Sequence, residues 1–259
     1  MARPARAGPA QRFPGDSGRC LRSNWILHST MAAINWNVKA SLAAILPLMS
    51  PGSSDRPRLT RKGEATRARI VDAAAELILQ QGVASTTIEE VRDGAHVSSS
   101  QLYHYFEDKP ALVRAVIERQ ADMAIGTQER FDLSSLEGLR EWRDFVVDHT
   151  RDTGGRGGCP VGSLGPALAE TEPEARAMLA VAFKRWEASI MAGLLRMHAL
   201  GRLGPDANPR LLALALLAAL EGGLLLAQIQ RDPEPLAAGL DAMLTFIASL
   251  STTSTSLDR

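Results

Sequence analysis

The sequence predicts an all-α protein, and three of its features support this. Ala, Leu and Arg, which have the highest helix propensities, dominate the 259-residue chain. Aromatic residues make up only 5% of the chain and β-branched residues are few beside Ala and Leu, which argues against a β-sandwich. Apolar residues recur at helical spacing from residue 64 to residue 250, and no segment shows the alternation of a strand. We therefore expect helices around a sizeable core.

The first 57 residues differ from the rest of the chain. Residues 1–24 are rich in Arg, Pro and Gly without any period, which is typical of disorder. Residues 40–49 are apolar, but no cleavage-like site follows them, and a membrane span needs about 20 such residues. We interpret residues 1–57 as a disordered or mis-annotated extension, with Met49 as the favoured start; a genuine disordered tail and a targeting segment are the alternatives.

Turn signals divide the following residues into helices. The first, Glu64–Gln81, is expected to end at Gly82, a typical glycine beyond a helix C-terminus. Thr87 and Glu90 form a capping-box pattern that opens a short helix to about Gly94. The elements expected after it are a helix from Ser98 to Tyr105, a helix over Pro110–Arg130 capped by Glu107 or Asp108, a helix over Ser134–Arg151, a glycine-rich loop at 153–162, and helices over Ser163–Glu170, Pro173–Leu200, Pro209–Arg231 and from Pro233 or Pro235 to Leu250.

Residues 88–106 have the pattern of a helix-turn-helix, two short helices joined by a tight turn. The second helix begins with small hydroxyl and amide side chains on its outer face, where they can hydrogen-bond base edges in a major groove. Two short helices with polar caps occur in many α proteins, so a purely structural role fits this pattern as well. The apolar residues spaced to face inward are Ile88, Val91, Ala95, Val97, Leu102 and Tyr105.

Residues 67–119 resemble the N-terminal domain of the TetR family of bacterial transcriptional regulators. The resemblance rests on a first helix that ends in Gln-Gln-Gly, a Thr-Thr pair that opens the second helix, and the run VSSSQLYHYFEDK. It implies a three-helix DNA-binding head within residues 58–112. Arg92 and His96 depart from the family pattern, which usually has a small residue and a turn glycine there. A shorter segment, residues 158–170, resembles the LmrA/YxaF-like branch of the family.

The resemblance also implies which residues meet DNA. The first turn of the second helix would read bases, and Gln101 fits an adenine edge. Tyr103 and Tyr105 would give their hydroxyl groups to phosphates, whereas His104 either enters the groove or packs on Tyr105. Six basic residues against one acid between residues 56 and 69 form an arm that either follows the phosphates or is merely solvated. The DNA-binding candidates are Arg58 and Arg61 in the arm, Ser98, Ser99, Ser100 and Gln101 in the first turn, Tyr103, His104 and Tyr105 after it, and Thr87 and Lys109 as phosphate contacts.

Residues 113–251 are expected to form a domain for ligand binding and dimerisation, followed by a polar tail at 252–259, because the resemblance implies such a domain. The apolar segment 211–227 and the last helix would pair with a second copy as a four-helix bundle. Glu221 near the middle of that segment argues against a membrane span, because a central carboxylate costs about 2.5–3.5 kcal/mol on insertion scales. We therefore expect a homodimer and no membrane partner.

Aromatic side chains at helical spacing on two helices are the candidates for a ligand pocket. Such stripes are more often plain core, and the alternative is the wall of a pocket for a lipophilic or aromatic molecule. A cysteine beside Pro160 is expected to pack structurally, with a redox-sensitive thiol as the alternative. The ligand-binding candidates are Trp142, Phe145 and His149 on one helix, Phe183 and Trp186 on another, and Cys159 in the loop between them.

No pattern of a catalytic site is present in the sequence. The glycine-rich loop lacks the Gly-Lys-Ser/Thr ending of a phosphate-binding loop, and no His or Cys spacing is that of a metal site. We therefore expect no enzyme activity, cofactor or metal. Because the net charge is +0, DNA must be recognised by a local patch. We predict a cytoplasmic, homodimeric repressor that binds double-stranded operator DNA and is released by a small lipophilic or aromatic effector; the alternative is a helical small-molecule-binding module without DNA-binding function.

Overall fold

The computed structural model describes residues 59–252. The prediction of an all-α fold is confirmed, since this range contains nine α-helices and a 3₁₀ turn. Within the same range the only extended pairing is an isolated bridge between Leu203 and Ser251. The predicted extension, the candidate Arg58 and the tail beyond Thr252 lie outside the described residues.

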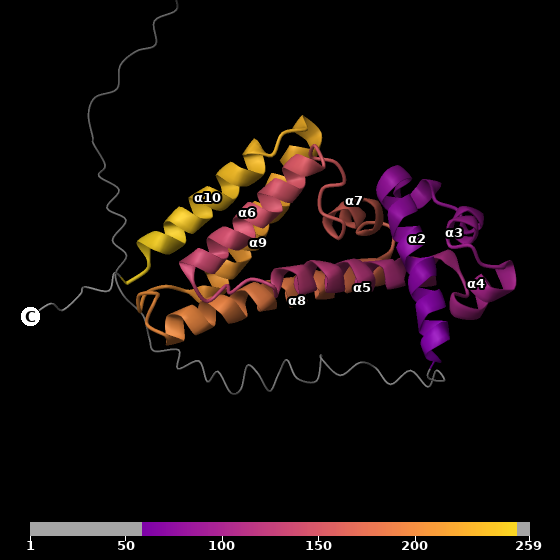
Figure 1. Ribbon diagram of the computed structural model, residues 1–259, viewed down its shortest axis with the longest axis horizontal. Coiled ribbons are helices and arrows are strands. Elements are labelled where there is room, and N and C mark those ends of the chain that lie inside the picture. Colours follow the sequence, from indigo (N-terminus) through magenta and orange to yellow (C-terminus); the bar gives the residue numbers. More distant parts are fainter. Residues whose placement is uncertain (1–58, 253–259) are drawn as a thin grey trace, which may run out of the picture. The chain divides into compact units, whose positions relative to one another are not determined.

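Three helices form the helix-turn-helix head: α2 (Arg61–Ser85), α3 (Ile88–Gly94) and α4 (Ser99–Tyr105) (Figure 1). α2 packs against α3, and α3 contacts α4. The predicted caps of the two short helices are present, because the Thr87 and Ser98 side chains each accept a backbone N–H in the first turn of α3 and α4, respectively. The buried side chains that hold the three helices together include Ile70, Ala74, Val91, Ala95, Leu102 and Phe106.

The first helix is interrupted at the glycine that was expected to end it. Gly82 has φ +82° and ψ 163°, a backbone region that is close to glycine-only. One more helical turn follows, and the Thr86 N–H and hydroxyl both donate to the Gly82 carbonyl, at 3.3 and 2.9 Å. The break therefore turns the chain from α2 towards the start of α3 at Ile88.

α5 (Lys109–Gln128) follows the head, and Asp108 caps it by accepting the Ala111 N–H at 2.7 Å. The predicted helix over residues 163–170 is shorter than expected: a 3₁₀ turn is followed by a single α-helical turn, and neither has a side-chain cap. The remaining elements are α6 (Leu136–Asp152), η2 (Gly162–Leu164), α7 (Gly165–Leu168), α8 (Pro173–Ala199), α9 (Pro209–Gln230) and α10 (Glu234–Ser249).

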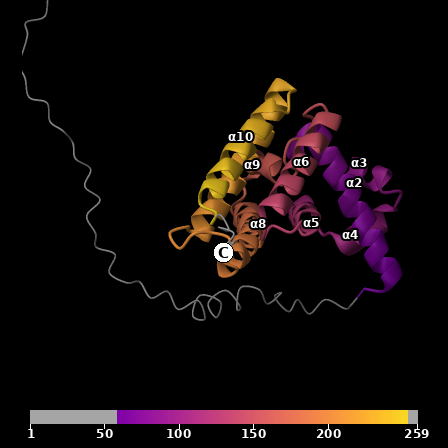
Figure 2. The same cartoon turned by 60° about the vertical axis from the view of Figure 1, so that its left-hand side comes forward.

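α5 joins the head to the other helices, which we call the body. It packs on α2 and runs beside α8, α8 packs against α9, and α10 packs against both α9 and α6 (Figures 1 and 2). Gly223 allows α9 and α10 to approach closely, since a Cβ there would lie 2.7 Å from Leu236 Cα. One apolar core extends from Ile70 in α2 to Ile247 in α10, so head and body are packed as one structure.

Candidate nucleic-acid interface

The first turn of α4 is held by a reciprocal capping box. The Ser98 hydroxyl accepts the Gln101 N–H at 3.2 Å, and Gln101 Oε1 accepts the Ser98 N–H at 3.0 Å. The hydroxyl groups of Ser98 and Ser100 also share a hydrogen bond of 3.0 Å. The backbone at the start of this helix is therefore fixed before any partner binds.

The same turn faces solvent. Ser98, Ser99, Ser100 and Gln101 are all exposed, whereas Leu102 directly after them is fully buried. Small exposed side chains on a rigid helix N-terminus can enter a major groove without steric conflict. The structure thus gives this turn the accessibility that base reading requires.

Gln101 also caps α4, a structural role that was not predicted for it from the sequence. A bidentate pair with an adenine uses both ends of the amide, but Oε1 is already bonded to the Ser98 N–H. While the box is closed, this bond fixes the orientation of the amide, which leaves Nε2 and one lone pair of Oε1 for a base. The signal was present in the sequence, because Ser-x-x-Gln before an apolar residue is itself a capping-box pattern.

The turn between α3 and α4 accommodates the two departures from the family pattern. His96 has φ +52°, in the left-handed region where a glycine is usual. The turn is closed by hydrogen bonds from the His96 and Val97 N–H groups to the Asp93 and Arg92 carbonyls, at 3.1 and 3.2 Å. The Arg92 side chain points out to the Asp93 carboxylate, at 2.7 Å, so its charge is not buried between the helices.

The two candidate phosphate contacts beside the turn, Thr87 and Lys109, already have partners within the protein. The Thr87 hydroxyl donates to Glu90 Oε2 at 2.9 Å and accepts the Glu90 N–H at 3.2 Å. Hydrogen bonds from the Thr87 N–H and hydroxyl lower the pKa of Glu90, and Gln81 and Lys109 act in the same direction. Lys109 Nζ donates to the Ala84 carbonyl at 3.3 Å. Both side chains thus stabilise the junction of α2, α3 and α5.

The two tyrosines of α4 differ in their surroundings. Tyr103 is 54% exposed, so its hydroxyl can reach a partner freely. Tyr105 is half-buried, and its hydroxyl lies next to Gly63 in the first turn of α2. His104 is exposed and also packs edge-on against Tyr105, with ring centroids 4.9 Å apart, so the structure is compatible with both roles considered for it.

Most basic residues at the start of α2 are exposed. Arg61, Lys62 and Arg69 are exposed, and Arg61 is the first residue of the helix. Arg67 instead lies over the Phe106 ring, with its guanidinium carbon 5.2 Å from the centroid. Part of the predicted arm is therefore exposed, whereas Arg67 packs on the head.

The structure does not place all six ligand-binding candidates in similar surroundings. Trp142 and Cys159 are buried, and Trp186 is buried with its indole N–H bonded to Gln128 Oε1 at 2.7 Å. Phe145 and His149 on α6 are exposed and stack at 6.3 Å, and Phe183 is half-buried against Trp186 at 6.4 Å. The buried aromatic rings are part of the apolar core, as the more frequent interpretation of such stripes predicts.

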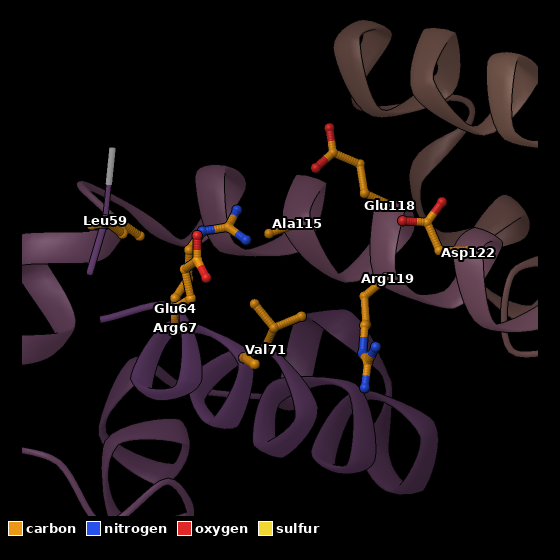
Figure 3. A pocket seen from close by; sticks show the side chains of 9 residues that line it. Leu59, Glu64, Arg67, Val71, Ala115, Glu118, Arg119 and Asp122 are labelled. Carbon is orange, nitrogen blue, oxygen red and sulfur yellow. The ribbon is translucent and has the colours of Figure 1, made fainter. Parts of the chain in front are cut away.

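A cavity of about 440 Å³ lies elsewhere, between α2 and α5, and none of the six candidates lines it. Val71 and Ala115 form an apolar part of its wall, and charged side chains of both signs surround them (Figure 3). Two of these charges have partners, because Arg119 bonds to Asp72 at 2.9 Å and Asp122 accepts from Arg185 at 2.7 Å. Among residues 59–252, no group of three His, Cys, Asp or Glu side chains could hold a metal ion.

α9 presents an apolar face to the surface. By length and composition this helix could cross a membrane. In the folded protein, however, 44% of its most apolar 18-residue stretch is buried. Its other face, together with Phe246 of α10, leaves large apolar side chains exposed. The exposed residues of α9 are Leu211, Leu214, Leu225, Leu226 and Ile229.

Two family models match the chain and together span more than half of it. Residues 70–116 match the model of bacterial regulatory proteins of the tetR family, and residues 135–243 match the model of the tetracyclin repressor-like C-terminal domain. The first match contains α3, α4 and the capped turn, and the second contains α6 to α9.

Two relatives that the chain matches over most of their length are named as regulators. The transcriptional regulator AcuR of Cereibacter sphaeroides is 28% identical over 188 residues, which cover 70% of this chain and 84% of AcuR. The HTH-type transcriptional repressor DhaR of Mycobacterium sp. is 23% identical over 182 residues, or 70% of this chain and 89% of DhaR. A crystal structure of a regulatory protein TetR from Rhodobacter sphaeroides superposes with a TM-score of 0.63 at 25% identity, covering 70% of this chain and 97% of that one.

Proposed function

The chain belongs to the TetR family of bacterial DNA-binding regulators, and we propose that it is a ligand-responsive repressor that binds its operator as a homodimer. One observation carries the proposal: the capped first turn of α4 is rigid and exposed on the head. The name of the relative DhaR, a transcriptional repressor, supports repression over activation. Because the family consists of regulators, we expect no enzyme activity, and we expect the protein to act in the cytoplasm. The narrower LmrA/YxaF-like branch stays a prediction that rests on residues 158–170.

We assign base reading to the small side chains of that turn. Ser99 and Ser100 would meet base edges directly, and Gln101 would use its Nε2 group while its Oε1 keeps the cap closed. Tyr103 and the exposed residues at the start of α2 would bind phosphates, which fix the register of the head on DNA. Tyr105, Thr87 and Lys109 would stabilise the head through their contacts within the protein and reach phosphates at its edge.

We assign the exposed face of α9, with α10, to the homodimer. Gly222 lies on this face with no atom within 4 Å of the position of a Cβ, so a second helix can approach closely there. Pairing the two helices across a two-fold axis gives the four-helix bundle expected from the sequence. Two heads about 34–36 Å apart would then read the two halves of a palindrome.

We assign residues 58–112 to DNA binding and residues 113–251 to effector binding and dimerisation. A lipophilic or aromatic effector would use the aromatic side chains of α6 and α8, where Phe145 and His149 are exposed and Phe183 is half-buried. Binding would favour a body that holds the heads at the wrong spacing. Effector and DNA would then each weaken the binding of the other by the same coupling free energy, about 1–3 kcal/mol. A helical binding module without DNA-binding function is the alternative.

A gel shift on DNA from around the protein's own gene, repeated over a range of salt concentrations, tests this function. The proposal expects a shifted band that resists competitor DNA, with an affinity that falls steeply as salt rises. Tyr103→Ala and Gln101→Ala should weaken the shift, whereas Val181→Ala, at a side chain of α8 that is 55% exposed, serves as the control. A well-folded protein that binds aromatic molecules but shifts no DNA would favour the alternative.

A further inference from the structure

The glycine-rich loop between α6 and η2 lies unusually close to α9. A Cβ at Gly155 would collide with the Ala227 carbonyl oxygen, and one at Gly158 would lie 2.6 Å from Gln228 Oε1. The Arg231 guanidinium at the end of α9 also donates to the Gly155 carbonyl, at 3.3 Å. Side chains at these glycines would therefore push the loop away from the C-terminal half of α9.

A buried acid and a buried thiol lie where the end of the loop meets α9. The Glu221 carboxyl of α9 lies against Cys159 and against Gly162, where a Cβ would collide with Glu221 Oε2. The Cys159 sulfur in turn accepts the Gly162 N–H at 3.2 Å. Burial raises the pKa of Glu221 despite the contact with the thiol, and it raises the pKa of Cys159 as well. The neutral forms of both groups are therefore favoured here.

Of Glu221 and Cys159, Glu221 has the less complete hydrogen bonding. Its Oε1 atom is buried without a hydrogen-bond partner, and Arg143 Nε is the other buried side-chain atom of that kind among the described residues. An unpartnered buried oxygen destabilises the folded state, so a carboxyl at this position needs a reason. From the sequence alone, Glu221 argued only against a membrane span.

The other side of the same loop touches the head. Both η2 and α7 contact α2, and a Cβ at Gly157 would lie 3.5 Å from the Leu79 side chain of α2. Leu79 lies one turn before the break at Gly82 that sets the start of α3. The loop is thus a packed connection from α9 in the body to α2 in the head, separate from the connection through α5.

We propose that Glu221 is a positioning residue for operator binding: it holds the glycine-rich loop on α9, and the loop in turn holds α2. The inference rests on the proposed function, because it assigns a purpose to the position of the head. It also gives the proposed dimer helix a direct route to the head, since Glu221 lies at the edge of the exposed apolar face of α9, one turn before the exposed Leu225. A change in α9 that loosens the loop would then loosen the head.

Hydrogen exchange of the full chain, read by mass spectrometry at one pH, tests the linkage without DNA. Glu221→Ala should speed exchange in residues 75–85 of α2 by roughly two- to thirtyfold, as expected for coupling through a packed network. Glu221→Gln should restore slow exchange, because the amide keeps the shape and stays neutral. Glu141→Ala, at an exposed glutamate of α6, is the matched control. Unchanged exchange in α2 of a folded Glu221→Ala dimer would overturn the proposal.

Leu79→Ala keeps the proposal testable if Glu221→Ala does not fold, because Leu79 is 44% exposed and its truncation leaves the core intact. It should speed exchange in loop residues 154–162, and unchanged exchange there would contradict the linkage.

The same variants are then titrated with the DNA fragment bound by the wild type, where Glu221→Ala and Leu79→Ala should both weaken binding. Because both substitutions act through one loop, the double variant should bind DNA no more weakly than whichever single variant has the lower affinity. If the two losses of binding free energy add up in the double variant, the proposal is wrong. A wild type that binds no DNA but shows the exchange effect would refute the proposed function and leave the linkage supported.

Discussion

Two neighbouring serines illustrate how single residues divide the work at the DNA-binding face. Ser98 belongs to the capping box, where its hydroxyl and backbone are both bonded to Gln101. Ser99 is the first residue of α4 and lies exposed beside it. One residue therefore shapes the helix start, and the next is available to a partner.

We expect Ser98→Ala and Ser99→Ala to separate these two tasks. Loss of the cap at Ser98 should cost about 1 kcal/mol, which lowers Tm by roughly 2–4 °C for a domain of this size. Ser99→Ala should leave Tm unchanged and weaken binding to operator DNA. Thermal unfolding and a binding titration of both variants check this division. Equal changes in Tm for the two serines would contradict the assignment of the cap.

The buried carboxyl of Glu221 gives a pH dependence whose sign follows from burial. Because burial raises its pKa in the folded protein, the unfolded chain ionises first as the pH rises above the ordinary value of 4.5. Stability is therefore lost from that pH upward until the raised pKa is passed, and the loss then stays constant. Glu221→Gln should match the wild type below pH 4.5 and exceed its Tm at pH 7 to 8. A lower Tm for Glu221→Gln at neutral pH would show that the ionised carboxylate stabilises the fold.

At the scale of the element, helix ends are where local sequence determines structure. The break at Gly82 is a clear case, because its backbone angles suit glycine alone. Gly126 is the opposite case: it lies exposed within α5, with nothing within 4 Å of the position of a Cβ. The two glycines should therefore respond in opposite directions to the same substitution.

We expect Gly82→Ala to destabilise the protein by about 1–3 kcal/mol, the usual cost of forcing a side chain into such a region. Gly126→Ala should stabilise it by about 0.5–1 kcal/mol, because alanine is the better helix former. Chemical denaturation of both variants measures the two free energies of unfolding. A stabilising Gly82→Ala substitution would mean that the break is not required.

The helix ends and the helix-turn-helix were predictable from the sequence because both depend on short-range patterns. The caps at Thr87 and Ser98 and the left-handed turn at His96 lie within a few residues of their partners. The contact between Cys159 and Glu221 was not predictable, since it joins a loop to a helix 62 positions further on. Whether the aromatic side chains lie in the core or line a pocket was not predictable for the same reason, because it depends on packing between distant segments.

At the scale of the whole molecule, the exposed face of α9 should determine the oligomeric state. Leu225 on this face and Leu200 at the end of α8 are both 57% exposed, so they form a matched pair. Leu225→Glu should convert a dimer into a monomer, because it places a charge in the apolar interface. Leu200→Glu should leave the dimer intact. Analytical ultracentrifugation measures the oligomeric state of both variants. If Leu225→Glu remains a dimer, the proposed interface is wrong.

In the proposed complex, the first turn of α4 lies against the DNA duplex. The direct measurement compares the operator affinity of Ser99→Glu with that of Ala188→Glu, at an exposed alanine of α8, at the same salt concentration. A carboxylate at the base edges, within the negative field of the duplex, should cost several kcal/mol of binding, so Ser99→Glu should bind at least about a hundredfold more weakly. Ala188→Glu should bind like the wild type, because it adds the same charge far from the proposed contact. Equal affinities for the two variants, with both proteins folded and dimeric, would show that α4 does not face the DNA.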